Sequence, residues 1–419
     1  MSRVVSLAVI LYACAAPVAA QSLTIAQAVD DALQHNLSLI AERSQLTIAE
    51  AQMVAARLRP NPVVSLSADH LDALGTGFDV KNNGGPPELA WRVDVPLERG
   101  GKRDARVALA SVVRSAAEAQ VAEAVRTLRQ DVTLACVDLM AAQATRTLAA
   151  DTLRTYEDLV RLNRARVAAG SIPLFDATRS EVAMLQFRAT VVRAGLEVAA
   201  ATAKLRVLLG RPVGDPIAIA DSLTEVETTT APDGAALESL AMSARADLRA
   251  LQLAQARSVA DLRLQEALGR VDYTIGAEYR RQQGLAARSN SLGVFFSAPL
   301  PISNRNQGEI ARAAGERDRV ERQMAARRAQ IAADVRSALY EYATTRDLVA
   351  AIERELLKPA THAREISAYT YKAGGATLLE FLDAQRAFND TMQSYVDAQA
   401  SLKRASARLN AAVGTEVVR

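Results

Sequence analysis

Hydrophobic and polar positions along the chain follow two different periods, and the change from one to the other occurs twice. Apolar residues recur every three to four positions over most of the sequence, which is typical of amphipathic helices. Four short segments instead alternate apolar and polar residues, which predicts β-strands. The expected strands cover residues 62–71, 89–96, 271–281 and 291–299. The pattern therefore predicts a mainly α protein with a small β part.

The predicted helices are long, and one is far longer than a typical globular helix. They cover residues 23–58, 102–168, 174–209, 236–268, 308–373 and 377–412. Residues 102–168 contain no Pro or Gly, and apolar spacings of four and three alternate, as in a coiled coil. At 1.5 Å per residue this helix is roughly 100 Å long. Its heptad positions are Val121, Val125, Leu128, Val132, Ala135, Leu139, Ala142, Arg146, Ala149, Leu153, Tyr156, Val160, Asn163 and Val167. In the helix 308–373, Pro359 predicts a kink.

The same order of segments occurs twice, which indicates two internal repeats. Each long helix is expected to end at a glycine turn, Gly170-Ser171 in the first copy and Gly374-Gly375 in the second. A return helix follows each turn and itself ends at a glycine. We place the first repeat at 21–210, a central linker at 211–235, the second repeat at 236–414 and a C-terminal tail at 415–419.

Each expected strand has one apolar and one polar face, which is the pattern of transmembrane β-strands. Trp91, Tyr273 and Tyr279 fall on the apolar faces, as the residues of an interfacial aromatic girdle do. A sheet of a soluble domain, with one face on a core, is the alternative, but no segment is left to cover these faces. In lipid, four strands cannot close a barrel alone, because open edges leave backbone groups unpaired. The barrel must then be shared between subunits.

The polar faces of the expected strands bear on how many subunits share the barrel. They carry the charged residues Asp69, Arg92, Asp94, Asp272, Glu278 and Arg280. Two chains would give eight strands and an interior filled by side chains, whereas three would give twelve strands and a pore. Charged side chains fit a water-filled lumen better than a packed interior. The sequence therefore favours three or more subunits.

The N-terminus predicts export. Residues 1–20 combine Arg3, an apolar run and Val18-Ala19-Ala20, which is typical of a signal peptide. An alternative cut would leave Cys14 as a lipidated N-terminus. Beyond residue 20 only Cys136 is left, so we expect no intrachain disulfide.

Composition and charge argue against several function classes. Aromatic residues make up 4% of the 419 residues and the net charge is +3, which gives no case for a nucleic-acid surface. The three histidines, His35, His70 and His362, are scattered, and Cys136 has no sequence partner for a metal or nucleophile site. We therefore expect no enzyme, no cofactor and no dedicated metal site.

Strand pairs, long helices, glycine turns and return helices, present twice after a signal peptide, resemble the TolC-type outer-membrane efflux channel family. The resemblance covers essentially the whole mature chain. Pro96-Leu97 and Pro299-Leu-Pro301-Ile302 are similar to the family's strand-exit motif. Asn304-Arg-Asn-Gln-Gly308 is similar to the version in the heavy-metal cation (CzcC-like) branch.

This resemblance implies a fold and a set of partners. The fold is a homotrimer with four strands per subunit, in which a twelve-stranded outer-membrane β-barrel continues into a long α-helical periplasmic barrel. The partners are a periplasmic adaptor (membrane fusion) protein and an inner-membrane pump, commonly of the resistance-nodulation-division type. The turns Gly170-Ser171 and Gly374-Gly375 would lie at the periplasmic tip, where the adaptor docks.

The resemblance also implies roles for residues near the turns. Glu380 and Asp383, one helical turn apart, match acids that ring the periplasmic constriction of the family. Tyr371 and Asp176 match residues in the bonds that hold some members closed. The arginine that pairs with such an acid falls at Ala376 here, so that bond is absent or differently made.

The leading interpretation is a passive outer-membrane channel of a tripartite efflux system that exports heavy-metal cations from the periplasm or cytoplasm. A drug-efflux or type I protein-secretion duct of the same fold is the alternative within this class. A coiled-coil structural protein of the envelope is the alternative from another class. It explains the heptads but not the doubled, two-faced strand pairs.

Overall fold

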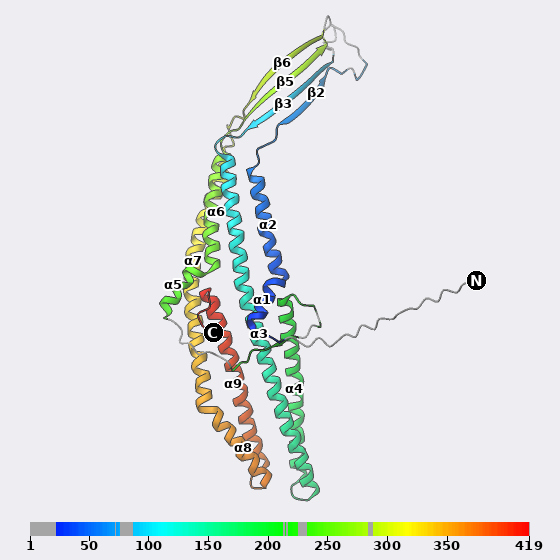
Figure 1. Cartoon of the computed structure of the whole chain (residues 1–419), viewed down its shortest axis with the longest axis vertical. Helices are drawn as coiled ribbons and strands as arrows, with labels where there is room; N and C mark the ends of the chain where they lie inside the picture. Colours follow the sequence, from blue (N-terminus) through cyan, green and yellow to red (C-terminus); the bar gives the residue numbers. More distant parts are fainter. Residues whose placement is uncertain are drawn as a thin grey trace, which may run out of the picture. The chain divides into compact units, whose positions relative to one another are not determined.

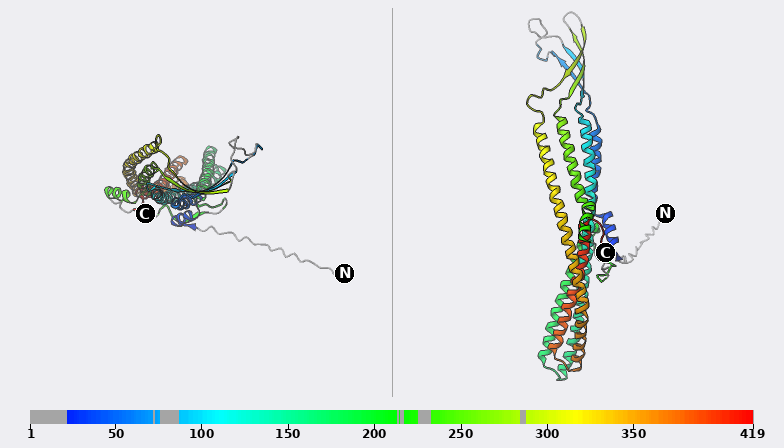
Figure 2. Two further views of the ribbon diagram at one scale, coloured as in Figure 1. Left: turned by 90° about the horizontal axis from the view of Figure 1, so that it is seen from above. Right: turned by 90° about the vertical axis from the view of Figure 1, so that its left-hand side faces the viewer.

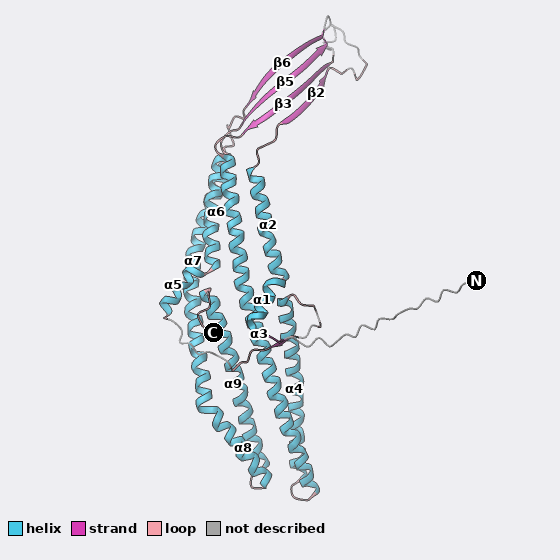
Figure 3. Cartoon of the chain, in the orientation of Figure 1, coloured by secondary structure: helices cyan, strands magenta, loops and turns pink. Residues whose placement is uncertain are grey.

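The computed structural model describes residues 22–71, 73–75, 87–212, 214, 217–224, 233–283 and 288–418. The predicted signal peptide with Cys14, most of the loop between the first two expected strands, and part of the central linker lie outside the described residues. Helices dominate, and the prediction of a mainly α chain with a small β part is confirmed (Figure 3).

The chain divides into two compact units, which do not coincide with the two predicted repeats. The turn unit comprises Met1–Leu37, Thr127–Gly234 and Arg336–Arg419. The sheet unit comprises Ser38–Arg126 and Ala235–Val335. Each unit therefore contains segments from both halves of the sequence.

The β part of the sheet unit is a single antiparallel sheet with the strand order β2-β3-β5-β6 (Figure 1). The strands are β2 (Val63–Asp69), β3 (Glu88–Leu97), β5 (Tyr273–Gln283) and β6 (Arg288–Ser297). In the register, Trp91 lies between Leu66 and Tyr279, whereas Arg92 lies opposite Glu278. The hairpins of the two sequence halves thus join along β3 and β5, and β2 and β6 are the outer strands.

The helices of the sheet unit are most of α2 (Leu37–Arg57), α5 (Gly234–Ala244), α6 (Ala246–Leu268) and the first parts of α3 (Lys102–Ala168) and α7 (Gln307–Ala351). The single helix expected over 236–268 is wrong in one respect: it breaks at Arg245. The backbone of Arg245 is extended, with φ −70° and ψ 123°, and α6 starts after it.

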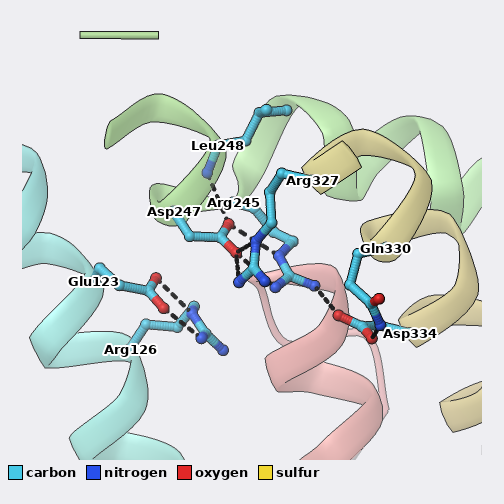
Figure 4. A network of polar contacts seen from close by, with 8 residues as sticks. All are labelled: Glu123, Arg126, Arg245, Asp247, Leu248, Arg327, Gln330 and Asp334. Carbon is cyan, nitrogen blue, oxygen red and sulfur yellow. Dashed lines mark hydrogen bonds and ion pairs between the residues drawn. The ribbon is translucent and has the colours of Figure 1, made fainter. Parts of the chain in front are cut away.

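A buried network of charges explains the break at Arg245 (Figure 4). Arg245 Nη2 donates to Asp247 Oδ2 at 2.7 Å, and its Nη1 donates to Asp334 Oδ2 on α7 at 3.2 Å. Arg327 Nε also donates to Asp247 Oδ2 at 2.8 Å, and the backbone N–H of Leu248 donates to Asp247 Oδ1 at 2.8 Å. A continuous helix would change the backbone angles that direct Arg245 into this network, and a buried charge without a partner is costly.

Asp247 is the acceptor at the centre of this network, and its pKa reflects that position. Burial alone raises the pKa, but hydrogen bonds from Arg245 and Arg327 outweigh burial and hold the pKa at about 2. The first turn of a helix also favours a carboxylate, because it presents free N–H groups. Asp247 is therefore ionised at every physiological pH.

The turn unit contains α1 (Ile25–His35), α4 (Leu174–Leu209), α8 (Leu357–Ala373), α9 (Leu378–Val413) and the later parts of α3 and α7. β1 (Ser22–Leu23) and β4 (Ala218–Ile219) pair in parallel. Helices α8 and α9 lie side by side in all three ribbon views (Figures 1 and 2). Among the described residues, the core of the turn unit includes one apolar cluster of Val137, Met140, Leu223, Val396 and Ala400, and another of Tyr156, Leu159, Tyr371, Leu378 and Phe381.

The helix expected over 23–58 is interrupted at Asn36, which separates α1 from α2. Asn36 has φ −65° and ψ 118°, and its Nδ2 donates to the carbonyl of Leu208 at 2.9 Å. The carbonyls at the end of α4 lack partners within their own helix, so a side chain that caps one of them stabilises the interruption. The sequence could not show this contact, because it joins residues far apart in the chain.

The long helix of the second half is irregular between α7 and α8. One π-helical turn, η2 (Ile352–Leu356), joins them, and the N–H of Leu357 donates to the carbonyl of Ile352. The kink predicted at Pro359 is thus replaced by an irregular turn just before it. The cause is the same, since Pro359 cannot donate to the carbonyl four residues earlier. By contrast, α3 runs unbroken for 67 residues.

Across the described ranges, no helix carries an apolar stretch of the kind that crosses a bilayer.

Candidate functional site

The two glycine turns of the turn unit have the same backbone construction. Gly170 and Gly374 adopt left-handed conformations, with φ of 68° and 83°. The N–H groups of Ser171 and Gly375 then donate to carbonyls five residues earlier, at 2.8 and 2.9 Å. This is the hydrogen bond of a Schellman motif, which ends a helix and favours glycine at the left-handed position. The repeat detected in the sequence therefore has the same local geometry in both copies.

The helix after the second turn begins with a capping box formed by Thr377 and Glu380. The backbone N–H and the hydroxyl of Thr377 donate to Glu380 Oε2 at 2.7 and 2.9 Å. The N–H of Glu380 donates back to Thr377 Oγ1 at 3.3 Å. Hydrogen bonds from the backbone and then the side chain of Thr377 lower the pKa of Glu380. Glu380 therefore stabilises the start of α9 in addition to carrying a negative charge.

The acids predicted at the constriction lie on two helices. Glu380 and Asp383 are exposed on α9 and stand three residues apart, so they share one face of the helix. Asp176 is half-buried in the first turn of α4. Among the described residues, no hydrogen bond or ion pair joins Asp176 to Glu380, Asp383 or Tyr371. Within one chain, the structure therefore groups the α9 acids but not Asp176.

Tyr371 forms its bond with a residue that the sequence did not single out. Its ring is buried and its hydroxyl donates to Asn163 Oδ1 on α3 at 2.5 Å. Asn163 is fully buried, and its Nδ2 has no hydrogen-bond partner. The available signal was its place in the predicted heptad: a polar residue in a coiled-coil seam usually fixes register.

Arg166 is a second missed residue, and it links α3 to the end of α8. Its guanidinium donates to the carbonyl of Tyr371 at 3.2 Å and to that of Lys372 at 2.8 Å. It also lies 5.2 Å from the centre of the Tyr371 ring. The last carbonyls of a helix lack partners and carry partial negative charge, so a cation is favourable there. Ala376, the position at which the sequence resemblance led us to expect an arginine, packs against the apolar cluster around Tyr371.

In a sheet that covers a core, the apolar face is buried and the charged face is exposed to water. In this sheet the apolar side chains are the more exposed ones. On the apolar face Trp91 is 62% exposed, and Leu292 and Val294 are each 85% exposed. On the polar face Glu278 and Glu88 have side-chain exposures of only 11% and 18%. Apolar groups therefore face outward while charged groups are shielded, which is unfavourable in water.

The charges on the polar face are largely paired with one another. Arg280 bonds Glu88 at 2.8 Å and Glu278 at 3.0 Å, and Arg92 bonds Asp94 at 2.9 Å. The guanidinium of Arg92 lies 4.1 Å from the centre of the Phe295 ring, which explains why this aromatic residue occupies the polar face. Asp69 lies at the end of β2 on the same face, opposite Glu88.

Asp272, predicted on the polar face of a strand, lies just before β5 instead. Its carboxylate accepts from Lys102 Nζ at 2.7 Å and from the N–H of Arg99 at 2.9 Å. The ladder between β3 and β5 starts only at the pair Leu97–Tyr273. Asp272 therefore ties the start of α3 to the start of β5.

The motif Asn304–Gly308 forms the connection into α7. Asn306 adopts φ 64° and its Nδ2 donates to the carbonyl of Gln265, near the end of α6, at 2.8 Å. Gln307 Nε2 donates to the carbonyl of Ser303 at 3.0 Å. These side chains bond backbone carbonyls and fix the shape of the connection. The motif therefore has a structural role and does not identify a substrate.

No grouping of three or more possible metal-ligating side chains occurs within the residues that the structure describes. Burial raises the pKa of the Cys136 thiol to about 12, which removes it as a thiolate ligand or nucleophile at neutral pH.

Comparisons with known proteins agree with each other. The profile of the family "Outer membrane efflux protein" matches residues 28–211 and 237–415. The cobalt-zinc-cadmium resistance protein CzcC of Cupriavidus metallidurans is 25% identical over 384 residues, which cover 88% of this chain and 84% of CzcC. The outer-membrane channel CmeC of Campylobacter jejuni has a similar fold, with a TM-score of 0.79 and 13% identity over 94% of this chain and 86% of CmeC. CusC gives a TM-score of 0.76 and 17% identity over 94% of this chain and 93% of CusC.

Proposed function

The chain belongs to the outer membrane efflux protein family, and from that premise we propose that it is the passive outer-membrane channel of a tripartite efflux system. It is an outer-membrane protein that extends into the periplasm, and it is not an enzyme. Membership in this family removes the alternative of a coiled-coil structural protein. The remaining steps concern assembly, gate and cargo.

One observation carries the proposal: the sheet exposes its apolar face and shields its charged face. Lipid is the environment in which an exposed row such as Trp91, Leu292 and Val294 is stable. The charged side chains of Arg92, Asp94, Glu278, Arg280 and Asp69 would then line a water-filled lumen.

Among the residues that the structure describes, the outer strands β2 and β6 each have one edge without a partner strand. Such edges are costly in lipid, and closing a barrel is the way to remove them. Three copies would supply twelve strands, enough for an aqueous pore. We therefore assign the protein a homotrimer, in which β6 of one subunit pairs with β2 of the next.

The proposed domain plan follows the internal repeat. Residues 1–20 are the signal peptide, 21–210 and 236–414 are the two repeats, 211–235 form an equatorial linker and 415–419 a tail. In this plan the glycine turns form the periplasmic tip, and Gly170-Ser171 and Gly374-Gly375 dock the adaptor protein. The adaptor would connect the channel to an inner-membrane pump of the resistance-nodulation-division type.

The gate in this proposal consists of a ring of acids and a latch behind it. Glu380 and Asp383 from each subunit line the constriction, with Asp176 nearby. Three copies of paired carboxylates around a narrow axis create a negative field that attracts cations. The latch is the contact of α8 with Tyr371, Asn163 and Arg166, which takes the place of the missing arginine at Ala376.

The proposed cargo is a heavy-metal cation. The support is the name of a similar protein, the cobalt-zinc-cadmium resistance protein CzcC. A drug or a secreted protein is the alternative cargo for the same channel. Deletion of the gene should make the strain sensitive to cobalt, zinc or cadmium, and the gene on a plasmid should restore resistance. Unchanged sensitivity of the deletion strain to all three metals contradicts the metal assignment.

Planar-bilayer conductance of the purified protein, with its mass measured in detergent, tests the channel. We expect discrete conductance steps and a particle of three chains. A protein that neither inserts nor conducts, or that stays monomeric in detergent, contradicts the proposal.

The acidic ring is tested with Glu380→Gln combined with Asp383→Asn. Glutamine retains the capping hydrogen bonds, so this variant removes charge without disturbing the start of α9. Block of conductance by divalent cations should weaken by roughly tenfold or more, because several charges leave a narrow ring. Thr377→Ala is the matched control, since it breaks the capping box and retains the charges. Equal block in the double variant and the wild type contradicts the proposed ring.

A further inference from the structure

All four connections between the sheet and the helices lie at the same end of the sheet. Since the strands are antiparallel, the start of β2, the end of β3, the start of β5 and the end of β6 are at that end. The connections are residues 58–62, 98–101, 269–272 and 298–306. They belong to the same sheet unit.

Each connection carries or adjoins an exposed aliphatic side chain. The residues are Leu58, Leu97, Leu268, Leu300 and Ile302, and the last two are each 79% exposed. Leu97 belongs to the apolar face of the sheet, opposite Tyr273, and the other four lie within five residues of a strand end along the chain. Exposed apolar surface is therefore present at the connections as well as on the strands.

An exposed arginine accompanies these side chains at every connection. We name Arg59, Arg99, Arg103, Arg270 and Arg305 the junction arginines; all five are exposed. Other cations of the same region are committed to carboxylates: Lys102 to Asp272, and Arg106 to Glu98. Within the residues described, none of the junction arginines forms an ion pair. Their charge is thus available to a partner outside the chain.

The structure holds several of these arginines in place through contacts other than ion pairs. Arg99 lies 4.2 Å from the centre of the Tyr273 ring, at the base of the apolar face. Arg103 Nε donates to the carbonyl of Arg57 at 2.8 Å, and Arg305 Nε to that of Pro301 at 3.1 Å. The side chain of Arg270 crosses Gly100 so closely that a Cβ there would lie 2.5 Å from its Cδ.

We infer that the junction arginines bind the phosphate groups of anionic phospholipids at the periplasmic surface of the outer membrane. Guanidinium groups match phosphate geometry, and aliphatic neighbours fit the first carbons of acyl chains. The closeness of these residues along the chain to strands with an exposed apolar face favours a lipid over a protein partner. The inference rests on the proposed insertion of the sheet in the bilayer, but not on the cargo or the gate.

The test is lipid binding by the full-length protein in dodecyl-maltoside, measured by native mass spectrometry. Dioleoylphosphatidylglycerol is titrated against dioleoylphosphatidylcholine, which has the same acyl chains and no net charge. We expect the wild type to retain phosphatidylglycerol preferentially. Replacing all five junction arginines with Gln should raise the phosphatidylglycerol concentration for half-saturation by about tenfold or more, and leave phosphatidylcholine binding unchanged.

A matched control removes the same charge elsewhere. Arg43, Arg188, Arg193, Arg322 and Arg328 are exposed on helices. Their replacement by Gln should leave the lipid preference intact. Equal binding of both lipids by the wild type, or an equal loss in the control, overturns the inference. If the five-fold variant does not fold, Arg59→Gln with Arg270→Gln is measured instead, since neither guanidinium donates a hydrogen bond within the described residues; unchanged preference there also overturns it.

The binding assay needs no channel activity, so its failure is separable from failure of the proposed function. A wild type that conducts but shows no lipid preference contradicts only the role of the junction arginines. A wild type that binds phosphatidylglycerol but does not conduct contradicts only the channel.

Discussion

At the scale of single residues, buried polar side chains distinguish this chain from a simple pattern of apolar heptads. Arg245, Asp247 and Asn163 are all buried, and each bonds a residue distant in the sequence or on another helix. A buried polar group is tolerated only when it is paired, so each of these bonds constrains how helices meet. Their partners could not be predicted from the sequence, because helical spacing gives a face but not its neighbour.

The ion pairs of Asp247 predict a loss of stability in acid. Its pKa is about 2 in the folded protein against an ordinary 3.8, so the contribution is fully present above pH 3.8 and disappears as pH falls through 2. The depressed pKa corresponds to about 2 kcal/mol. Asp247→Asn should therefore destabilise the detergent-solubilised protein at pH 7 and flatten the acid side of its unfolding profile, measured by circular dichroism.

Asp318→Asn provides the comparison for that measurement. Asp318 pairs with Arg317 on the exposed surface of α7, where an ion pair contributes little. A pH profile equally flattened by both substitutions, or by neither, contradicts the role given to Asp247.

The hydrogen bond between Tyr371 and Asn163 makes a second prediction at this scale. Tyr371→Phe leaves a fully buried amide without its one partner, so the cost should be about 1–3 kcal/mol of unfolding free energy. The same substitution should raise the open fraction in bilayer recordings, because it weakens the contact of α8 with α3.

Two further variants make that prediction specific. Tyr369→Phe changes an exposed tyrosine of the same helix and should have no effect. Combining Tyr371→Phe with Asn163→Leu removes both polar partners, and most of the stability should return. If the double variant is as unstable as the sum of the single ones, the bond is not the cause.

At the scale of elements, local patterns predicted what local chemistry determines. Helix α3 was predicted at its full extent of 102–168 because nothing in that stretch interrupts a helix. The breaks at Asn36 and Arg245 were not, because they depend on a carbonyl of α4 and an aspartate of α7. The capping box of Thr377 and Glu380 was visible as a local motif, and its recognition would have shown that Glu380 has a structural role.

Alanine substitutions at two glycines, one in a turn and one inside a helix, should change the unfolding free energy in opposite directions. Gly374→Ala places a Cβ in open space but on a backbone with φ 83°, so it should destabilise the turn by about 1 kcal/mol. Gly195→Ala also meets open space, but in the middle of α4 with a helical backbone, and should stabilise by about 0.5–1 kcal/mol. Thermal unfolding of the two variants in detergent gives the comparison, and shifts in the same direction contradict the assignment of strain to Gly374.

At the scale of the whole molecule, one chain is chemically incomplete. Its sheet exposes Trp91 and Leu292, and no strand in the described part of the chain pairs with the outer edges of β2 and β6. The sequence could predict this incompleteness, because four two-faced strands came with no segment to cover them. It could not predict how the charges of the polar face pair, since Arg92 with Phe295 and Arg280 with Glu88 depend on the register of three strands.

The incompleteness predicts a specific contact between subunits. If β6 of one chain pairs with β2 of the next, cysteines placed on the polar faces of these strands should form disulfides between chains. Ser65 and Ser67 on β2 and Ser289 and Ser291 on β6 supply four pairs. Because barrel strands are tilted, the partner is displaced along the strand, and the panel is needed to find it. We expect at least one pair to give covalent trimers on non-reducing gels.

The controls for this experiment lie in the same chain. Variants with one added cysteine should stay monomeric on the gel, and the unmodified chain should do so as well, because Cys136 is fully buried. A closed ring of three requires every subunit to contribute both edges, so a ladder that ends at trimers distinguishes a barrel from open association of edges. Dimers without trimers, or a ladder that continues to higher species, contradict the three-subunit barrel and leave the edges of β2 and β6 without the partner proposed for them.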